Sequence, residues 1–107
     1  KNAEVNAENS EAGTSLILAA RKGYFEIVKM LLASGADSNK VDKFGWSALT
    51  MATYNEHVDI VVLLLEQDPS DYFVKKALKK AKRKKNNAMI ELLNGVINKR
   101  RELVIDI

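Results

Sequence analysis

The side chains of this 107-residue sequence that could do chemistry are chiefly lysines and aromatic residues. A basic run near the C-terminal end contains Lys75, Lys76, Lys79, Lys80, Lys82, Arg83, Lys84 and Lys85. Such a run attracts acidic protein segments, nucleic acid or anionic lipid. Upstream lie Phe44, Trp46 and Tyr54, and aromatic side chains anchor protein interfaces because they bury a large area at low entropic cost. The chemistry that these residue types offer is binding.

Catalytic and metal-binding patterns are missing from the sequence. His57 is the only histidine and there is no cysteine, which leaves no thiolate zinc site, disulfide or cysteine nucleophile. The sequence contains no G-x-S-x-G, no phosphate-cradling glycine loop and no H-E-x-x-H. Carboxylates such as Asp37 and Asp42 read as loop residues. We therefore expect a protein that is not an enzyme, with no cofactor and no metal, in which His57 has a structural role.

Composition favours a folded domain in a reducing compartment. Apolar residues make up 47% of the chain, which is enough for a continuous core. The absence of cysteine fits an intracellular location, cytoplasmic or nuclear, and Lys82 to Lys85 fits a short nuclear localisation signal. No apolar run approaches the length of a membrane span, and Lys1 to Ser10 carries no signal-peptide pattern.

Charge is distributed unevenly along the chain. Residues 1–70 carry a net charge of −4 and residues 71–107 carry +7, which together give the overall +3. The C-terminal part is therefore the part that attracts an acidic partner.

The elements that position these side chains follow from an internal repeat. Residues 9–36 resemble residues 42–69 at a spacing of 33, so that Leu16 corresponds to Leu49. This period is typical of stacked units that bury their apolar faces against their neighbours. Apolar periodicity predicts two helices in each unit, at 15–22 and 25–34, then at 48–55 and 58–67.

Capping and turn residues mark the ends of these helices. Thr14 and Ser47 are expected to cap the first helix of each unit, because a hydroxyl can accept a free backbone N–H. Gly23 and Gly35 are expected to end helices with positive φ. Residues 36–46 contain Gly45 and several turn formers, which predicts a projecting hairpin-like loop.

The third unit departs from this spacing. Residues 77–81 match 48–52 at a distance of 29, so the connecting loop has lost four residues. We expect a helix capped by Ser70 or Asp71 in place of the hairpin, and a second helix that continues through Gly95 towards Leu103. A polar last unit suits the end of a stack.

The repeated units resemble the ankyrin repeat. The first unit carries Thr14-Ser15-Leu16, then Gly23, Ile27-Val28, Leu31-Leu32 and Gly35-Ala36-Asp37-Ser38-Asn39 at the positions of that family's motif. The resemblance is strong over residues 3–65, moderate over 77–93 and absent after Val96. It implies an all-α fold: an ankyrin-repeat solenoid of antiparallel helix pairs with projecting hairpin loops.

The sequence also departs from the family's pattern. Ile17 and Thr50 stand where the family has the histidine of T-P-L-H, so the hydrogen bond of that histidine is expected to be missing and stability to be lower. We divide the single domain into the end of a preceding repeat (1–8), two repeats (9–41 and 42–70), a capping repeat (71–97) and a tail (98–107). The uncapped start suggests a piece of a longer array, or a trimmed or designed chain.

The resemblance also implies where a partner binds. In the family, the loops and first helices form a concave face that contacts targets. Carried over position by position, the contacting residues are Ser10, Glu11, Gly13, Arg21, Lys22, Val41, Lys43, Phe44, Trp46, Tyr54, Asn55, Arg83 and Lys84. The alternative for Phe44 or Trp46 is that the ring folds back on the neighbouring loop as local packing.

These observations favour a non-enzymatic module for protein–protein interaction, whose partner is another protein, with an acidic segment as one candidate for the contact. An alternative is electrostatic binding of nucleic acid or an anionic membrane by the basic helix at 75–85, although no aromatic residues alternate with its lysines. The basic run could also be a solvated capping face. A third reading is self-stacking of copies through the uncapped N-terminal end.

Overall fold

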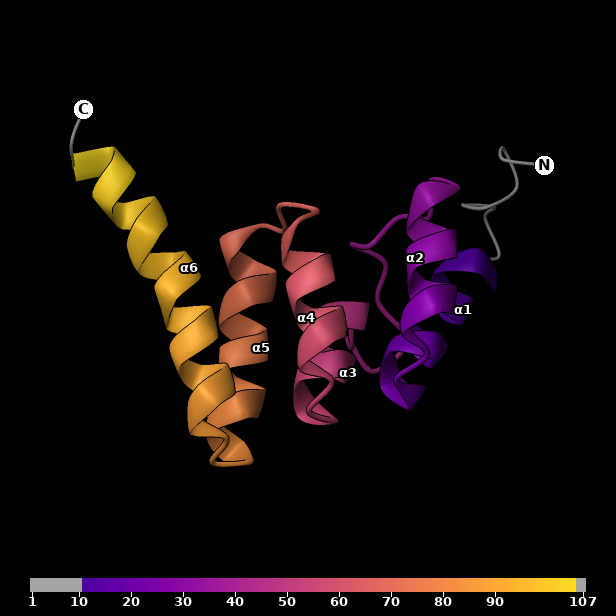
Figure 1. Cartoon of the computed structure of the whole chain (residues 1–107), viewed down its shortest axis with the longest axis horizontal. Coiled ribbons are helices and arrows are strands. Elements are labelled where there is room, and N and C mark those ends of the chain that lie inside the picture. The colour runs from indigo at the N-terminus through magenta and orange to yellow at the C-terminus, as the bar shows by residue number, and fades with distance from the viewer. Residues whose placement is uncertain (1–10, 106–107) are drawn as a thin grey trace.

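The computed structural model describes residues 11–105, with side chains from Ser15 to Leu103. This part of the chain contains helices and no β-strand; one isolated bridge joins Val41 and Ser47. The helices are α1 (Glu11–Lys22), α2 (Phe25–Ala33), α3 (Ala48–Tyr54), α4 (Val58–Leu65), α5 (Asp71–Arg83) and α6 (Asn87–Ile105). They follow one another as antiparallel pairs, which confirms the expected all-α solenoid (Figure 1).

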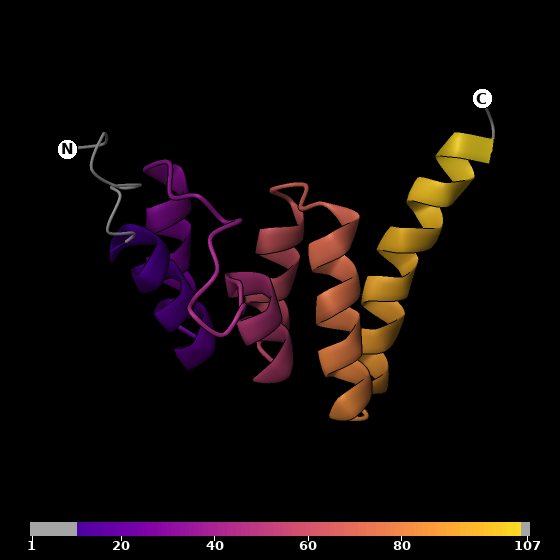
Figure 2. The ribbon, with the colours of Figure 1, turned by 180° about the vertical axis from the view of Figure 1, so that it is seen from behind.

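The helix pairs stack through their first helices. α3 packs between α1 and α5, α4 packs on α3 and α2, and α6 pairs with α5. Seen from behind, α1, α3 and α5 stand in sequence, with the 34–47 connection passing in front of the gap between the first two pairs (Figure 2). Ala19, Ala52 and Ala81 are buried at corresponding positions of the three helices. Their small side chains allow neighbouring helices to approach closely.

Corresponding turns share an unusual backbone conformation. After α1 the turn residue is Gly23 with φ 83°, after α3 it is Glu56 with φ 65°, and after α5 it is Lys85 with φ 57°. Gly35 and Asp68 repeat the same relation after α2 and α4, with φ 95° and 56°. The expected glycine stops are confirmed, and three non-glycine residues adopt the left-handed region that favours glycine.

The start of the first unit differs from the expectation. α1 begins at Glu11, so Thr14 lies inside the helix, and the prediction that it caps the helix is wrong. Glu11 and Gly13 are likewise helical and do not form a loop. Glutamate and alanine favour a first helical turn, and a carboxylate suits a helix N-terminus, which explains the extension. Ser10 and the segment 1–8 lie outside the described residues.

The other helix ends agree with the expected ranges to within two residues. Ser34, Asn55 and Glu66 serve as C-caps of α2, α3 and α4. In the third unit the hairpin is absent and α5 starts at once after Ser70, as expected, although the Ser70 side chain makes no capping hydrogen bond. α6 runs unbroken through Gly95 to Ile105, so the proposed boundary between residues 97 and 98 falls inside a helix.

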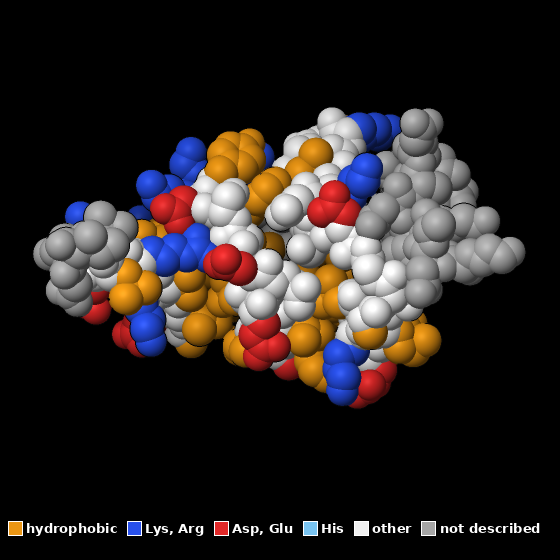
Figure 3. Space-filling view, turned by 90° about the horizontal axis from the view of Figure 1, so that it is seen from above, with side chains coloured by type: hydrophobic (Ala, Val, Ile, Leu, Met, Phe, Trp, Pro, Cys, Tyr) orange, Lys and Arg blue, Asp and Glu red, His pale blue; other side chains and the backbone are white. Residues whose placement is uncertain are grey.

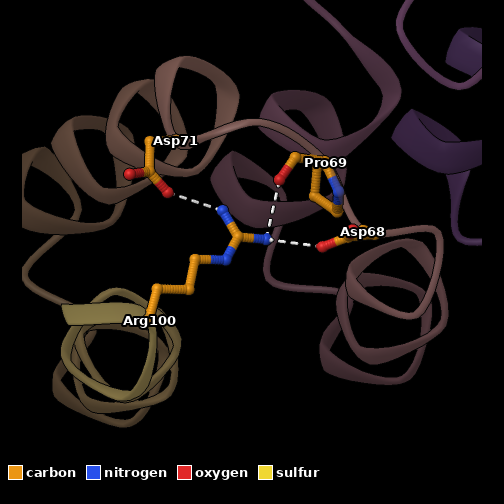
Figure 4. Close-up of polar contacts among 4 residues, drawn as sticks. All are labelled: Asp68, Pro69, Asp71 and Arg100. Carbon is orange, nitrogen blue, oxygen red and sulfur yellow. Dashed lines mark hydrogen bonds and ion pairs between the residues drawn. The ribbon is translucent and has the colours of Figure 1, made fainter. Parts of the chain in front are cut away.

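Arg100 joins α6 to the turn between α4 and α5. Its Nη1 lies 2.6 Å from Asp71 Oδ1, and its Nη2 lies 3.2 Å from Asp68 Oδ1 and 2.7 Å from the carbonyl oxygen of Pro69 (Figure 4). The guanidinium supplies several donors in a fixed plane, so one side chain holds three acceptors of the turn. This contact fixes the later part of α6 beside the start of α5.

His57 joins the first two units. Its Nε2 lies 2.9 Å from the carbonyl oxygen of Arg21, at the C-terminal end of α1. Its ring lies so close to Gly23 that a Cβ there would be 2.7 Å from His57 Cε1. The expected structural role of His57 is therefore a contact between repeats.

Candidate functional site

The hairpin-like loop of the second unit is organised by Asp42. Asp42 Oδ1 accepts hydrogen bonds of 2.9 Å from the backbone N–H groups of Phe44 and Trp46. The Asp42 carbonyl accepts from Gly45 N, and Asp42 N donates to the Trp46 carbonyl, both at 2.9 Å. Gly45 has φ 84°, which closes the turn. The loop therefore presents Phe44 and Trp46 from a defined backbone.

The loop leads directly into a firmly capped helix. Ser47 and Thr50 form a reciprocal capping box: Ser47 N donates to Thr50 Oγ1 at 2.8 Å and Thr50 N donates to Ser47 Oγ at 3.2 Å. Thr50 Oγ1 also donates to the Ser47 carbonyl at 2.9 Å. The threonine hydroxyl thus supplies a side-chain hydrogen bond at the position where one was expected to be missing. At Ile17 the position is apolar and buried.

Two of the predicted aromatic residues contact each other and two lysines, one on α5 and one at its C-cap. The rings of Trp46 and Tyr54 meet edge to face, with centroids 5.4 Å apart. Lys80 Nζ lies 4.2 Å from the Trp46 centroid, and Lys84 Nζ lies 4.5 Å from the Tyr54 centroid. These distances suit cation–π attraction, because the ring faces are negative. Both rings are half-buried, so Trp46 and Tyr54 contribute to packing between the units and also remain partly accessible at the surface.

A third lysine of α5, Lys76, lies next to the loop. Lys76 Nζ lies 3.4 Å from the Gly45 carbonyl oxygen, to which it donates a hydrogen bond, and 5.4 Å from the Tyr72 ring centroid. We name the set Lys76, Lys80, Lys84, Trp46 and Tyr54 the lysine–aromatic surface. Lys76 and Lys80 were not among the predicted site residues; the signal that could have identified them is the four-residue spacing of these lysines along one helix face.

Phe44 stands apart from this packing. Its side chain is 75% exposed, and its ring is contacted by Lys43, whose Nζ lies 5.4 Å from the ring centroid. The view from above shows hydrophobic side chains at the surface with lysine and arginine side chains among them (Figure 3). An exposed phenylalanine on an ordered loop is available to a partner.

The remaining predicted residues lie on several elements. Val41 and Arg83 are exposed, and Asn55 donates from its Nδ2 to the Met51 carbonyl at 2.9 Å, which caps its own helix. Arg21 borders an open hollow with Ile17, Leu18, Asp42 and Met51. Lys22 borders another at the outer end of α1 and α2.

The outer end of the first unit carries exposed apolar side chains. Leu18, Tyr24 and Ile27 are 43%, 51% and 45% exposed. The residue that corresponds to Ile27 in the second unit is Ile60, which is fully buried. The same position is thus covered where a preceding unit is present.

No helix within residues 11–105 is long and apolar enough to cross a membrane. A search of the described part of the chain finds no group of three or more His, Cys, Asp or Glu residues that could hold a metal ion.

Comparison with known proteins places these features in a family. A family model described as ankyrin repeats (3 copies) matches residues 16–101. Ankyrin repeat and SAM domain-containing protein 6 of Rattus norvegicus is 44% identical over 64 residues, which cover 59% of this chain and 7% of that protein. The Notch-regulated ankyrin repeat-containing proteins of Xenopus tropicalis and Homo sapiens are 41% and 39% identical over 61 residues, covering 57% of this chain and 54% of each protein. The chain therefore spans about half or less of these curated relatives.

Proposed function

The chain belongs to the ankyrin-repeat family, and from that premise we propose that it binds a partner protein through its loop and first-helix face. Ankyrin repeats generally mediate protein–protein interaction and form a non-enzymatic module. Here the proposed contact region comprises Phe44 and the lysine–aromatic surface, with Arg21, Lys43 and Arg83 as further charged groups.

The observation that supports this face is the arrangement of its aromatic residues. Asp42 holds the loop, the capping box fixes the start of α3, and Phe44 remains 75% exposed. A rigid, exposed aromatic beside half-buried ones is the composition of an interface anchor, because little side-chain entropy is lost on binding.

A pull-down from cell lysate tests the proposal. The parent is compared with Phe44→Ala/Lys43→Ala, and with a matched control, Met30→Ala/Lys29→Ala, in which an exposed apolar residue and an exposed lysine are removed from α2. We expect a protein that is captured by the parent and by the control and lost by the loop variant. Equal capture by all three would reject this face.

A second function, self-association, is supported by the exposed end of the first unit. Leu18, Tyr24 and Ile27 lie where the next unit has residues covered by its neighbour, so we propose that a second copy stacks there. Sedimentation velocity at rising concentration should show dimers that Ile27→Lys abolishes. A parent that stays monomeric throughout would remove this proposal.

An intracellular location, cytoplasmic or nuclear, stays a prediction, supported by the absence of cysteine.

A further inference from the structure

The lysines of the lysine–aromatic surface form a regular row. Lys76, Lys80 and Lys84 are spaced four residues apart on α5 and its C-cap. At 1.5 Å per residue, neighbouring members start about 6 Å apart along the helix axis. Their ammonium groups are held beside the Gly45 carbonyl, the Trp46 ring and the Tyr54 ring. The row is therefore ordered by neutral groups.

No carboxylate balances this row in the described part of the chain. Arg100 of α6 pairs with Asp68 and Asp71, and neither carboxylate is paired with Lys76, Lys80 or Lys84. Burial lowers the pKa of the Lys80 ammonium, and the nearby positive charges of Arg83, Lys76 and Lys79 lower it further. The surface thus holds several uncompensated positive charges at a fixed spacing.

We propose that this row binds an extended acidic segment of a partner protein, with carboxylates at alternate positions of the segment facing Lys76, Lys80 and Lys84. In an extended chain, residues on the same side recur at about 6.6–6.8 Å, which is close to the spacing of the lysines. This inference rests on the proposed protein-binding function and specifies the chemistry of the partner.

Phe44 offers an apolar contact to one end of the same acidic segment of the partner. The Gly45 carbonyl bonds Lys76, so the loop that carries Phe44 lies at the Lys76 end of the row. An apolar side chain that precedes or follows the acidic positions at this end packs on Phe44, whose ring is mostly exposed. The recognised pattern is therefore one apolar residue next to three alternating acidic residues.

A protein segment suits this surface better than single-stranded nucleic acid does. Nucleic-acid surfaces that use aromatic residues offer open ring faces on which bases stack. Trp46 and Tyr54 contact each other, and each ring also has a lysine ammonium over it. The ammonium N–H groups pair with carboxylates and with phosphates alike, so it is the lack of open ring faces for stacking that favours an acidic protein segment.

Fluorescence anisotropy with synthetic peptides tests the proposal. The probe is a labelled peptide with one Phe followed by three Glu at alternate positions, separated by Ser. The test variant is Lys76→Gln/Lys80→Gln/Lys84→Gln, and the matched control is Lys75→Gln/Lys79→Gln/Lys82→Gln, which removes three charges from another side of the same helix. Thermal unfolding of all three proteins confirms that the variants are folded.

We expect the test variant to bind the peptide about tenfold more weakly than the parent, and the control to lose less than about threefold. Equal losses of affinity in the two variants would overturn the proposal, because binding would then depend on the total positive charge of the helix and not on this row. Tighter binding of a peptide whose Glu residues are four apart, or of an oligonucleotide of equal charge, would also overturn it. If the peptide does not bind the parent while the pull-down still captures a protein that depends on the loop, the acidic-segment inference is rejected. The proposed protein-binding function is then retained.

Discussion

The Lys80 ammonium lies 4.2 Å from the centre of the Trp46 ring, which joins the loop of the second unit to the first helix of the third. Two features that are far apart in the sequence, the aromatic loop and the basic run, therefore form one surface. Cation–π attraction is strongest on tryptophan, so Trp46 holds Lys80 in place and Lys80 covers part of Trp46.

Removal of the Trp46 ring should destabilise the fold, whereas removal of the Phe44 ring should not. Trp46→Ala loses the contacts with Tyr54 and Lys80 together with half-buried apolar area, and we expect a loss of about 2 kcal/mol in the free energy of unfolding. Phe44→Ala should stay within about 0.5 kcal/mol because the ring is 75% exposed. Urea unfolding measures both, and a large loss at Phe44 would assign that ring to packing.

Much of this architecture could be predicted from the sequence. The recurrence of Leu16 at Leu49, with glycines after the helices, defined the repeat, the helix pairs and the loop. The prediction from capping residues was wrong at the start of the first unit. There α1 begins at Glu11, so Thr14 lies inside the helix and does not cap it.

The contacts within the site could be predicted less well. The aromatic positions followed from the repeat pattern, but the partners of Trp46 and Tyr54 come from α5, whose distance from them depends on how the units stack. The capping box between Ser47 and Thr50 was missed because Thr50 was treated only as a position without the family's histidine, although its hydroxyl can also form hydrogen bonds. Contacts between residues of different units can be identified only from the three-dimensional arrangement of the units.

Arg100 should contribute to stability through the turn that it holds. Arg100→Ala removes hydrogen bonds to Asp68, Pro69 and Asp71 from a side chain that is 28% exposed. We expect a loss of about 1–2 kcal/mol, discounted for solvent screening at the exposed aspartates. Arg101→Ala, next to it and exposed, is the control and should be neutral in chemical denaturation. Equal effects would show that Arg100 acts only through its charge.

The left-handed turn residues should respond in opposite directions to substitution. Glu56→Gly relieves a φ of 65° and should stabilise the protein by about 0.5–1 kcal/mol. Gly23→Ala should cost about 2 kcal/mol, because φ is 83° and the new Cβ would meet the His57 ring. Glu66→Gly, at a C-cap with φ −67°, is the control and should destabilise slightly. Thermal unfolding distinguishes the three, and a destabilised Glu56→Gly would contradict the strain argument.

Alkaline pH should affect both stability and binding through Lys80. Burial, Arg83, Lys76 and Lys79 lower its pKa in the folded state, so the unfolded chain binds more protons between the lowered and the ordinary value. The contribution of Lys80 to stability therefore rises with pH through that window, and it is small because the side chain is partly exposed.

Binding of an acidic peptide should reverse this shift. A carboxylate beside Lys80 favours the charged ammonium, so complex formation at a pH just below the ordinary lysine pKa should take up protons. Calorimetric titrations in two buffers of different ionisation enthalpy measure the uptake, and Lys80→Gln should reduce it. Proton release, or uptake unchanged by Lys80→Gln, would contradict the role given to this lysine.

Site-specific photo-crosslinking tests the central claim most directly. A benzophenone amino acid replaces Phe44 in the loop or, as the control, Met30 on α2, and both proteins are irradiated in cell lysate with mass spectrometry of the products. We predict a protein adduct from the Phe44 position that an excess of the unlabelled acidic peptide suppresses, and no such adduct from the Met30 position. Adducts from Met30 alone, or equal adducts from both positions, would contradict the assignment of the loop and first-helix face as the binding surface.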